Sequence, residues 1–142
     1  MGFSLIASAV ILSISIAMAV EIFTGDVFPT VDHINTAYED LKDRIDTQAH
    51  TNINITSITR LANNDTYDYT IIVQNTGSVT LPTATMTILF NGTREPFTAS
   101  AAYLYPESTA TFSVHGIAGA SSKRVKVVTK NAIADYLIYT PR

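Results

Sequence analysis

The N-terminal stretch of the chain is a long run of apolar residues. No charged residue occurs from Phe3 to Val20, and Ile22 and Phe23 extend the run beyond Glu21. As a helix, the uncharged run spans roughly 27 Å, which matches the hydrocarbon thickness of a bilayer. We therefore predict a transmembrane helix over residues 1–23. The apolar residues expected to form this anchor are Phe3, Leu5, Ile6, Val10, Ile11, Leu12, Ile14, Ile16 and Val20.

Small residues recur at every fourth position of this run. Ser4 and Ser8 form one such series, and Ala9, Ser13 and Ala17 form another. Small side chains at that spacing allow two membrane helices to approach closely. The pattern is consistent with helix packing, and we expect the chain to self-associate.

A cleaved signal peptide is the alternative interpretation of the same run. Ala17-Met18-Ala19 has the small-x-small form of a cleavage site, so that processing would follow Ala19. However, no Lys or Arg precedes the run, and the run is longer than the apolar core of a typical signal peptide. We therefore favour a retained anchor. Because the first basic residue is Lys42, the positive-inside rule predicts no orientation.

Residues 24–50 show helical spacing in an acidic setting. The apolar residues that follow Pro29 are Val31, Ile34, Tyr38, Leu41 and Ile45. Their intervals of three and four predict an amphipathic stalk helix, with a kink or interruption at Pro29. Two interpretations remain open. The helix either lies on the domain that follows, or continues from the anchor and pairs with a neighbouring subunit.

From Asn52 onward, apolar and polar positions alternate with the period of β-strands. Alternating runs lie at 52–56, 67–73, 86–90, 112–114 and 125–127, and a final apolar run covers 136–139. Turn-forming residues separate them at 63–65, 75–78, 91–92, 106–108 and 116–122. Short strands at this spacing predict an all-β immunoglobulin-like sandwich over residues 51–142. The expected fold is thus an N-terminal transmembrane and stalk helix followed by a β-sandwich.

Composition and net charge exclude several classes of protein and of binding site. The 142 residues include 46% hydrophobic and 15% charged residues, with no cysteine and a net charge of −3. A single apolar run in a chain of this length excludes a polytopic membrane protein and a large multidomain enzyme. The absence of cysteine excludes disulfides and thiolate metal sites. The net negative charge argues against a nucleic-acid partner.

No catalytic or metal-binding motif is recognisable. His33, His50 and His115 each stand without a second ligand at metal-binding spacing. The sequence contains no G-x-S-x-G turn, no Gly-rich phosphate loop and no H-E-x-x-H. We therefore expect a protein that is not an enzyme and that uses no cofactor and no metal.

Two features of the predicted domain bear on its location and its partners, and the first of them, the sequons, favours an external domain. Asn54, Asn64 and Asn91 begin N-x-[ST] sequons and are candidate N-glycosylation sites. The basic residues proposed to contact a partner are Lys123, Arg124, Lys126 and Lys130. Alternation places Arg124 and Lys126 on one strand face, where they would either protect an exposed sheet edge or dock an acidic partner.

Three stretches together resemble the archaellum protein F family, a membrane-anchored component of the archaeal motility machine. The Met1-Gly2-Phe3-Ser4 start with its Ala- and Ile-rich run is similar to the family's N-terminus. Residues 70–81 (TIIVQNTGSVTL) are similar to a strand–turn–strand signature shared by the archaellum F and G proteins. Residues 125–131 (VKVVTKN) are similar to their penultimate strand and turn, although Ala132 stands where a glycine is expected.

This resemblance implies a stator role. It places the helix in the cytoplasmic membrane as a single pass, and the β-domain at the cell surface in the space beneath the surface layer. The implied partners are the S-layer protein and a G-type stator protein. The alternative is an archaellin- or pilin-like subunit of an extracellular filament, whose N-terminal helix packs in the filament core. A secreted adhesion module released after Ala19 is a third interpretation.

Overall fold

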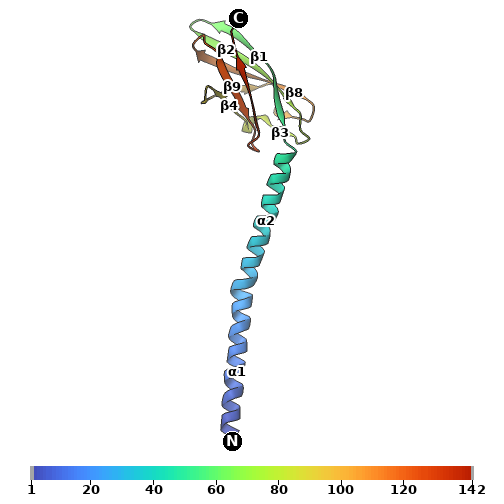
Figure 1. Ribbon diagram of the computed structural model, residues 1–142, viewed down its shortest axis with the longest axis vertical. Helices are drawn as coiled ribbons and strands as arrows, with labels where there is room; N and C mark the ends of the chain where they lie inside the picture. Colours follow the sequence, from blue (N-terminus) through green and yellow to red (C-terminus); the bar gives the residue numbers. More distant parts are fainter. Residues whose placement is uncertain (1, 142) are drawn as a thin grey trace. The chain divides into compact units, whose positions relative to one another are not determined.

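The computed structural model describes residues 2–141, which divide into a unit up to Asp43 and a unit from Arg44 onward. The first elements are α1 (Gly2–Ile22), a π-helical turn η1 (Phe23–Val27) and α2 (Phe28–Ala49) (Figure 1). Together they form one helix over Gly2–Ala49. An N-terminal helix followed by antiparallel β-sheets confirms the fold class expected from the sequence.

Pro29 lies inside this helix without ending it. We expected Pro29 to kink or interrupt the passage from the membrane segment, but the helical backbone continues through it, and the irregularity is the π-helical turn immediately before it. In that turn the Phe28 N–H donates to the Phe23 carbonyl, one residue further back than in an α-helix. Proline has no N–H to donate, and a widened turn accommodates such a gap. The Thr30 hydroxyl also donates to the Asp26 carbonyl, at 2.6 Å.

The β-domain consists of two four-stranded antiparallel sheets and one two-stranded sheet. The strands are β1 (Ile53–Asn63), β2 (Thr66–Asn75), β3 (Leu81–Pro82), β4 (Thr87–Phe90), β5 (Thr93–Glu95), β6 (Thr98–Ala99), β7 (Tyr103–Leu104), β8 (Thr109–Ala118), β9 (Lys123–Val128) and β10 (Ala134–Tyr139). One sheet has the order β1-β2-β8-β6, the second β10-β9-β4-β5, and β3 pairs with β7. A short 3₁₀ turn, η2 (Thr83–Thr85), lies between β3 and β4.

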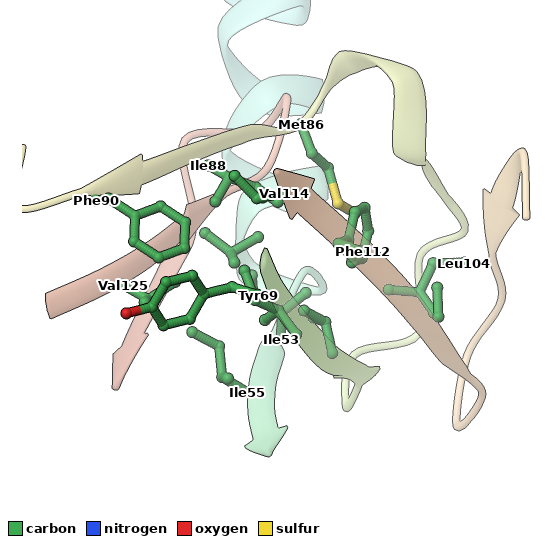
Figure 2. Packing of buried hydrophobic residues seen from close by; sticks show 14 of the residues in the cluster. Ile53, Ile55, Tyr69, Met86, Ile88, Phe90, Leu104, Phe112, Val114 and Val125 are labelled. Carbon is green, nitrogen blue, oxygen red and sulfur yellow. The ribbon is translucent and has the colours of Figure 1, made fainter. Parts of the chain in front are cut away.

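The core lies between the two larger sheets. Alternate residues of β2 and β8 point inward, as do those of β4 and β9, so that Ile71, Phe112, Ile88 and Val127 are fully buried. Figure 2 shows Ile88, Phe112 and Val114 pointing into a common interior. Tyr69 meets the ring of Phe90 edge-on at 4.9 Å between centroids, which joins the first sheet to the second. Such burial of alternate residues is the main stabilising term of the domain.

The turn at Asn75-Thr76-Gly77-Ser78 is hydrogen-bonded to the short connection between α2 and β1. The Gly77 N–H donates to the Asn52 carbonyl at 3.0 Å, and the Ser78 N–H donates to the His50 carbonyl at 2.9 Å. Asn75 is completely buried, and its side-chain amide donates to the carbonyls of Val79 and Leu104. A Cβ atom at Gly77 would collide with the backbone of His50 and Asn52. This turn, which lies in the stretch that resembles the archaellum proteins, therefore fixes the connection from α2 into β1, and we call it the joint.

Ala132 occupies a left-handed backbone conformation, with φ of 63°. The position is the one at which the family resemblance led us to expect glycine. The turn is closed by buried Thr129, whose N–H donates to the Ile133 carbonyl at 2.8 Å and whose carbonyl accepts from the Ala132 N–H at 3.0 Å. The geometry that favours glycine is thus present, and alanine adopts it at a cost in strain.

Candidate functional site

The predicted basic cluster is divided by the pleat of β9. Val125 and Val127 are fully buried, which places Arg124 and Lys126 together on the outer face of the second sheet. Lys123 belongs to the other face, and its Nζ donates to the Ala118 carbonyl at 2.8 Å. Lys130 lies in the turn beyond β9 and is exposed. Of the proposed partner-binding residues, the structure therefore brings together Arg124 and Lys126, puts Lys123 on the opposite face of the strand and places Lys130 in the turn beyond it.

A row of side chains crosses this outer face. Lys126 is opposite Tyr136 of β10 on one side and Leu89 of β4 on the other, and Leu89 is opposite Arg94 of β5. The Arg124 guanidinium lies over the Tyr136 ring, 4.4 Å from its centroid, in a cation–π contact. We call Leu89, Arg94, Arg124, Lys126 and Tyr136 the cationic face.

Arg94 was not among the residues proposed from the sequence. It is placed by the two-residue turn Asn91-Gly92, in which both residues have positive φ, at 50° and 93°. This is the hairpin turn type that Asn-Gly favours, and it pairs Phe90 with Thr93. The register then puts Arg94 beside Leu89. The Asn-Gly pair was the available sequence signal for this position.

The cationic face is open to solvent and carries unneutralised charge. A shallow depression of about 470 Å³ lies on it, lined by Leu89, Asn91, Gly92, Arg124 and Lys126. The two ion pairs within residues 2–141 each involve a histidine, and neither includes a cation of this face. Tyr136 is 54% exposed. A face that combines unpaired cations with an aromatic ring and a leucine is suited to bind a protein surface that is rich in carboxylates.

All three candidate glycosylation asparagines are exposed. Asn54 lies on β1, Asn64 in the β1–β2 turn with φ of 53°, and Asn91 in the β4–β5 turn. Asn91 borders the depression, and its Oδ1 accepts a hydrogen bond from the Arg124 N–H at 2.8 Å. Glycan occupancy of these sites stays a prediction.

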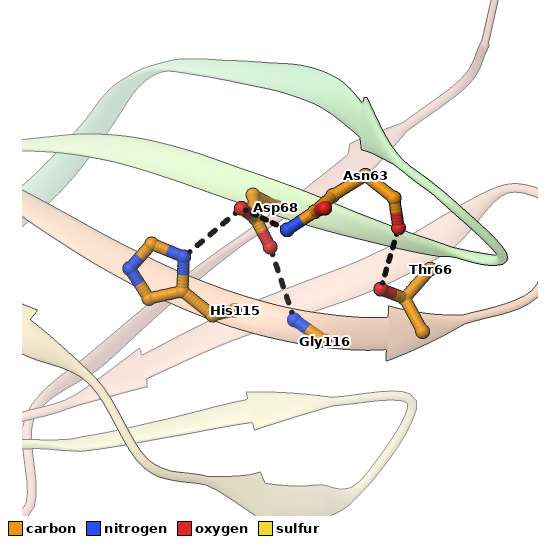
Figure 3. A network of polar contacts seen from close by, with 5 residues as sticks. All are labelled: Asn63, Thr66, Asp68, His115 and Gly116. Atoms are coloured by element: carbon orange, nitrogen blue, oxygen red, sulfur yellow. Dashed lines mark hydrogen bonds and ion pairs between the residues drawn. The ribbon is translucent and has the colours of Figure 1, made fainter.

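A polar network surrounds Asp68 on the first sheet (Figure 3). Its carboxylate contacts His115 Nδ1 at 3.1 Å and accepts from the Gly116 N–H at 3.1 Å and from Asn63 Nδ2 at 3.1 Å. These bonds, that from His115 above all, lower the pKa of Asp68 below its ordinary value of 3.8. The β2–β8 register shifts here, where His115 and Gly116 together face Asp68. The network therefore closes a β-bulge.

His33 and His50 lie outside the network around Asp68 and His115. His33 lies on α2 and is exposed, and His50 Nδ1 is 3.4 Å from the carboxylate of Asp46 one turn earlier. Within residues 2–141, no group of three or more His, Cys, Asp or Glu side chains is arranged to hold a metal ion. The cationic face is accordingly the surface with the clearest binding chemistry in the β-domain.

The helix over Gly2–Ala49 is long and apolar enough to cross a membrane, with a mean hydropathy of 2.4 in its most apolar window. The side chains predicted to form the anchor are between 51% and 92% exposed. In this segment the Ser8 hydroxyl donates to the Ser4 carbonyl and the Ser13 hydroxyl to the Ala9 carbonyl, each at 2.8 Å. Hydrogen bonds within the helix lower the cost of placing these hydroxyls in lipid.

Comparison with known proteins gives a structural likeness and no likeness in sequence. No family model matches the chain, and no curated protein matches it. The structure is similar to the archaellum periplasmic stator protein FlaG from Sulfolobus acidocaldarius, with a TM-score of 0.53 and 16% identity. The likeness covers 63% of this chain and 99% of the FlaG chain. At this identity the comparison establishes a shared fold.

Proposed function

We propose that this chain is a membrane-anchored, non-enzymatic stator component of an archaellum. The observation that carries the proposal is an apolar, exposed helix of membrane length in the same chain as a β-domain with the fold of a periplasmic stator protein. The resemblance of residues 70–81 and 125–131 to the archaellum F and G proteins supports the same role. Membership of the F family specifically is part of this proposal.

A stator must connect a bilayer to a fixed wall. The α1 segment supplies the membrane connection as a single-pass anchor, and the β-domain supplies a head beneath the surface layer. The buried core and the paired strands make the head resistant to deformation. The turn at Asn75–Ser78 forms backbone hydrogen bonds with His50 and Asn52, which connect α2 to the head. These features suit a protein that transmits force and performs no chemistry.

The cationic face is the surface we assign to the S-layer protein, and a G-type stator protein is the second proposed partner. Arg94, Arg124 and Lys126 would contact carboxylates of the S-layer protein, while Leu89 and Tyr136 would contact its apolar groups. Binding through exposed charges weakens as salt is added, because the Debye length falls to about 8 Å at physiological ionic strength. Salt sensitivity is thus a signature of this assignment.

The test measures binding of the detergent-solubilised full chain to purified S-layer protein. The double variant Arg124→Glu/Lys126→Glu is expected to bind roughly tenfold more weakly, or about 1.4 kcal/mol, since both charges are reversed at the contact. The control is Lys130→Glu, which reverses the charge of an exposed lysine in the turn beyond β9. Equal loss in the control, or no loss in the double variant, would overturn the assignment of the face.

The archaellum role itself is tested in cells. The full chain is expected in the membrane fraction, and its deletion is expected to abolish swimming while leaving filaments assembled. Recovery of the chain as a polymer in sheared extracellular filaments would show the archaellin- or pilin-like alternative to be correct. Intact-mass measurement of the native chain separates retention of the anchor from cleavage after Ala19.

A further inference from the structure

An apolar stripe runs along one side of α2. It consists of Val31, Ile34, Tyr38, Leu41 and Ile45, whose side chains are between 53% and 67% exposed. Their intervals of three and four are those of positions a and d in a heptad repeat, with Val31, Tyr38 and Ile45 at a. Exposure of such a stripe to water is unfavourable, so a surface that covers it is expected.

The charges around the stripe fit a second copy of the same helix. The acidic residues occupy the heptad positions away from the seam, and they are Asp32, Glu39, Asp40, Asp43 and Asp46. The only charged residues at the flanking e and g positions are Lys42 and Arg44. In a parallel, in-register pair, Lys42 meets Ala37 of the other copy and Arg44 meets Ala49. No like charges are brought together across the seam.

The anchor sets the direction of pairing. The helical backbone continues from Gly2 to Ala49, so two copies inserted in one bilayer with the same topology present α2 in the same direction. About two heptads are too short to pair stably from dilute solution. Confinement to a membrane raises the effective concentration of one helix near another, which favours a weak pairing.

We propose that α2 pairs with α2 of a second copy as a short, parallel, in-register coiled coil. The proposal rests on membrane retention of the anchor, which is part of the proposed function. Pairing would present two β-domains, and hence two cationic faces, from one membrane site. Two weak contacts to the S-layer would then act together and hold far longer than either alone.

The test uses single-cysteine variants of the full chain, which has no native cysteine. Each variant is reconstituted in lipid vesicles at a low ratio of protein to lipid and treated with a mild oxidant. Leu41→Cys, at a seam position, is expected to form disulfide dimers several-fold more than Asp43→Cys, its control at a position away from the seam. Ile34→Cys, one heptad earlier, is expected to behave as Leu41→Cys does.

The other outcomes overturn the proposal. Equal cross-linking of Leu41→Cys and Asp43→Cys would indicate random collision. Absence of dimers in both seam variants would indicate that the stripe stays exposed or packs against another part of the same chain. Preferential cross-linking between Val31→Cys and Ile45→Cys in a mixture would show antiparallel pairing. The vesicles contain no S-layer protein, so the cross-linking result does not depend on S-layer binding. Failure of α2 pairing can therefore be told apart from failure of the proposed S-layer contact.

Discussion

Replacement of Ala132 by glycine is expected to stabilise the β-domain. The residue has φ of 63°, in the left-handed region where a Cβ atom crowds the following carbonyl oxygen. Its side chain is exposed, so removal of the methyl group sacrifices little buried area. The turn itself is held by hydrogen bonds between Thr129 and Ile133, which the substitution leaves in place. Relief of backbone strain is therefore the main effect.

The magnitude follows from two opposing terms. An L-residue in the left-handed conformation costs about 1–2 kcal/mol. Glycine avoids that cost but loses more backbone entropy on folding, which offsets roughly 0.5–1 kcal/mol. The net change for Ala132→Gly is thus a gain of about 0.5–1 kcal/mol in the free energy of unfolding.

Ala134→Gly is the matched control, because it makes the same chemical change at an exposed residue at the start of β10. Ala134 is not among the residues with positive φ, so the entropy term acts alone and stability is expected to fall by about 0.5–1 kcal/mol. Both variants are unfolded by urea as the full chain in detergent, and the near-ultraviolet signal of the tyrosines is followed. Destabilisation by both substitutions would refute the strain at Ala132.

Two further predictions concern the joint and the bulge. Gly77→Ala is expected to destabilise the β-domain by about 1–3 kcal/mol in the same urea assay, because the added Cβ collides with the backbone of His50 and Asn52. Gly25→Ala is the comparison, because its Cβ meets open space and Gly25 is not among the residues with positive φ, and an equal loss there would contradict a steric cause. Asp68→Asn is expected to reduce the stability of the β-domain at pH 7. A carboxylate with a lowered pKa stabilises the fold only while it is ionised. The difference in stability from the wild type is therefore expected to vanish as the pH falls through the lowered pKa of Asp68. A difference that persists unchanged to low pH would show that charge is not the cause.

Long strands were predictable from the sequence because their periodicity is visible. Runs at 52–56, 67–73 and 125–127 correspond to β1, β2 and β9, where buried and exposed residues alternate. The short strands β3, β6 and β7 have two residues each, which is too few to show a period. They exist because neighbouring backbone supplies hydrogen-bond partners, and that depends on the fold.

The helix around Pro29 shows the limit of a local rule. Proline removes an N–H, and from that fact alone a kink or interruption was expected. The π-helical turn Phe23–Val27 accommodates the absence of the Pro29 N–H, and α2 follows it directly. A rule about one residue does not specify how the residues before it adjust.

The sequence predicted only part of the cationic face, namely Arg124 and Lys126. Alternation along β9 was enough to place Arg124 and Lys126 on one face, since that inference needs only the period of a strand. Arg94, Leu89 and Tyr136 joined them only through pairing of β5, β4, β9 and β10. Lys123 faces the opposite side of β9, and Lys130 lies beyond the end of that strand.

By itself, then, the sequence determined the segment long and apolar enough to span a bilayer, the helical stripe of α2 and the alternating strands of the head. These are local patterns, set by hydropathy and by the periods of helix and strand. The tertiary structure alone decided the cationic face, the bulge at Asp68 and the joint at Gly77. Each of these depends on residues far apart in the chain, and their proximity follows from strand order and register.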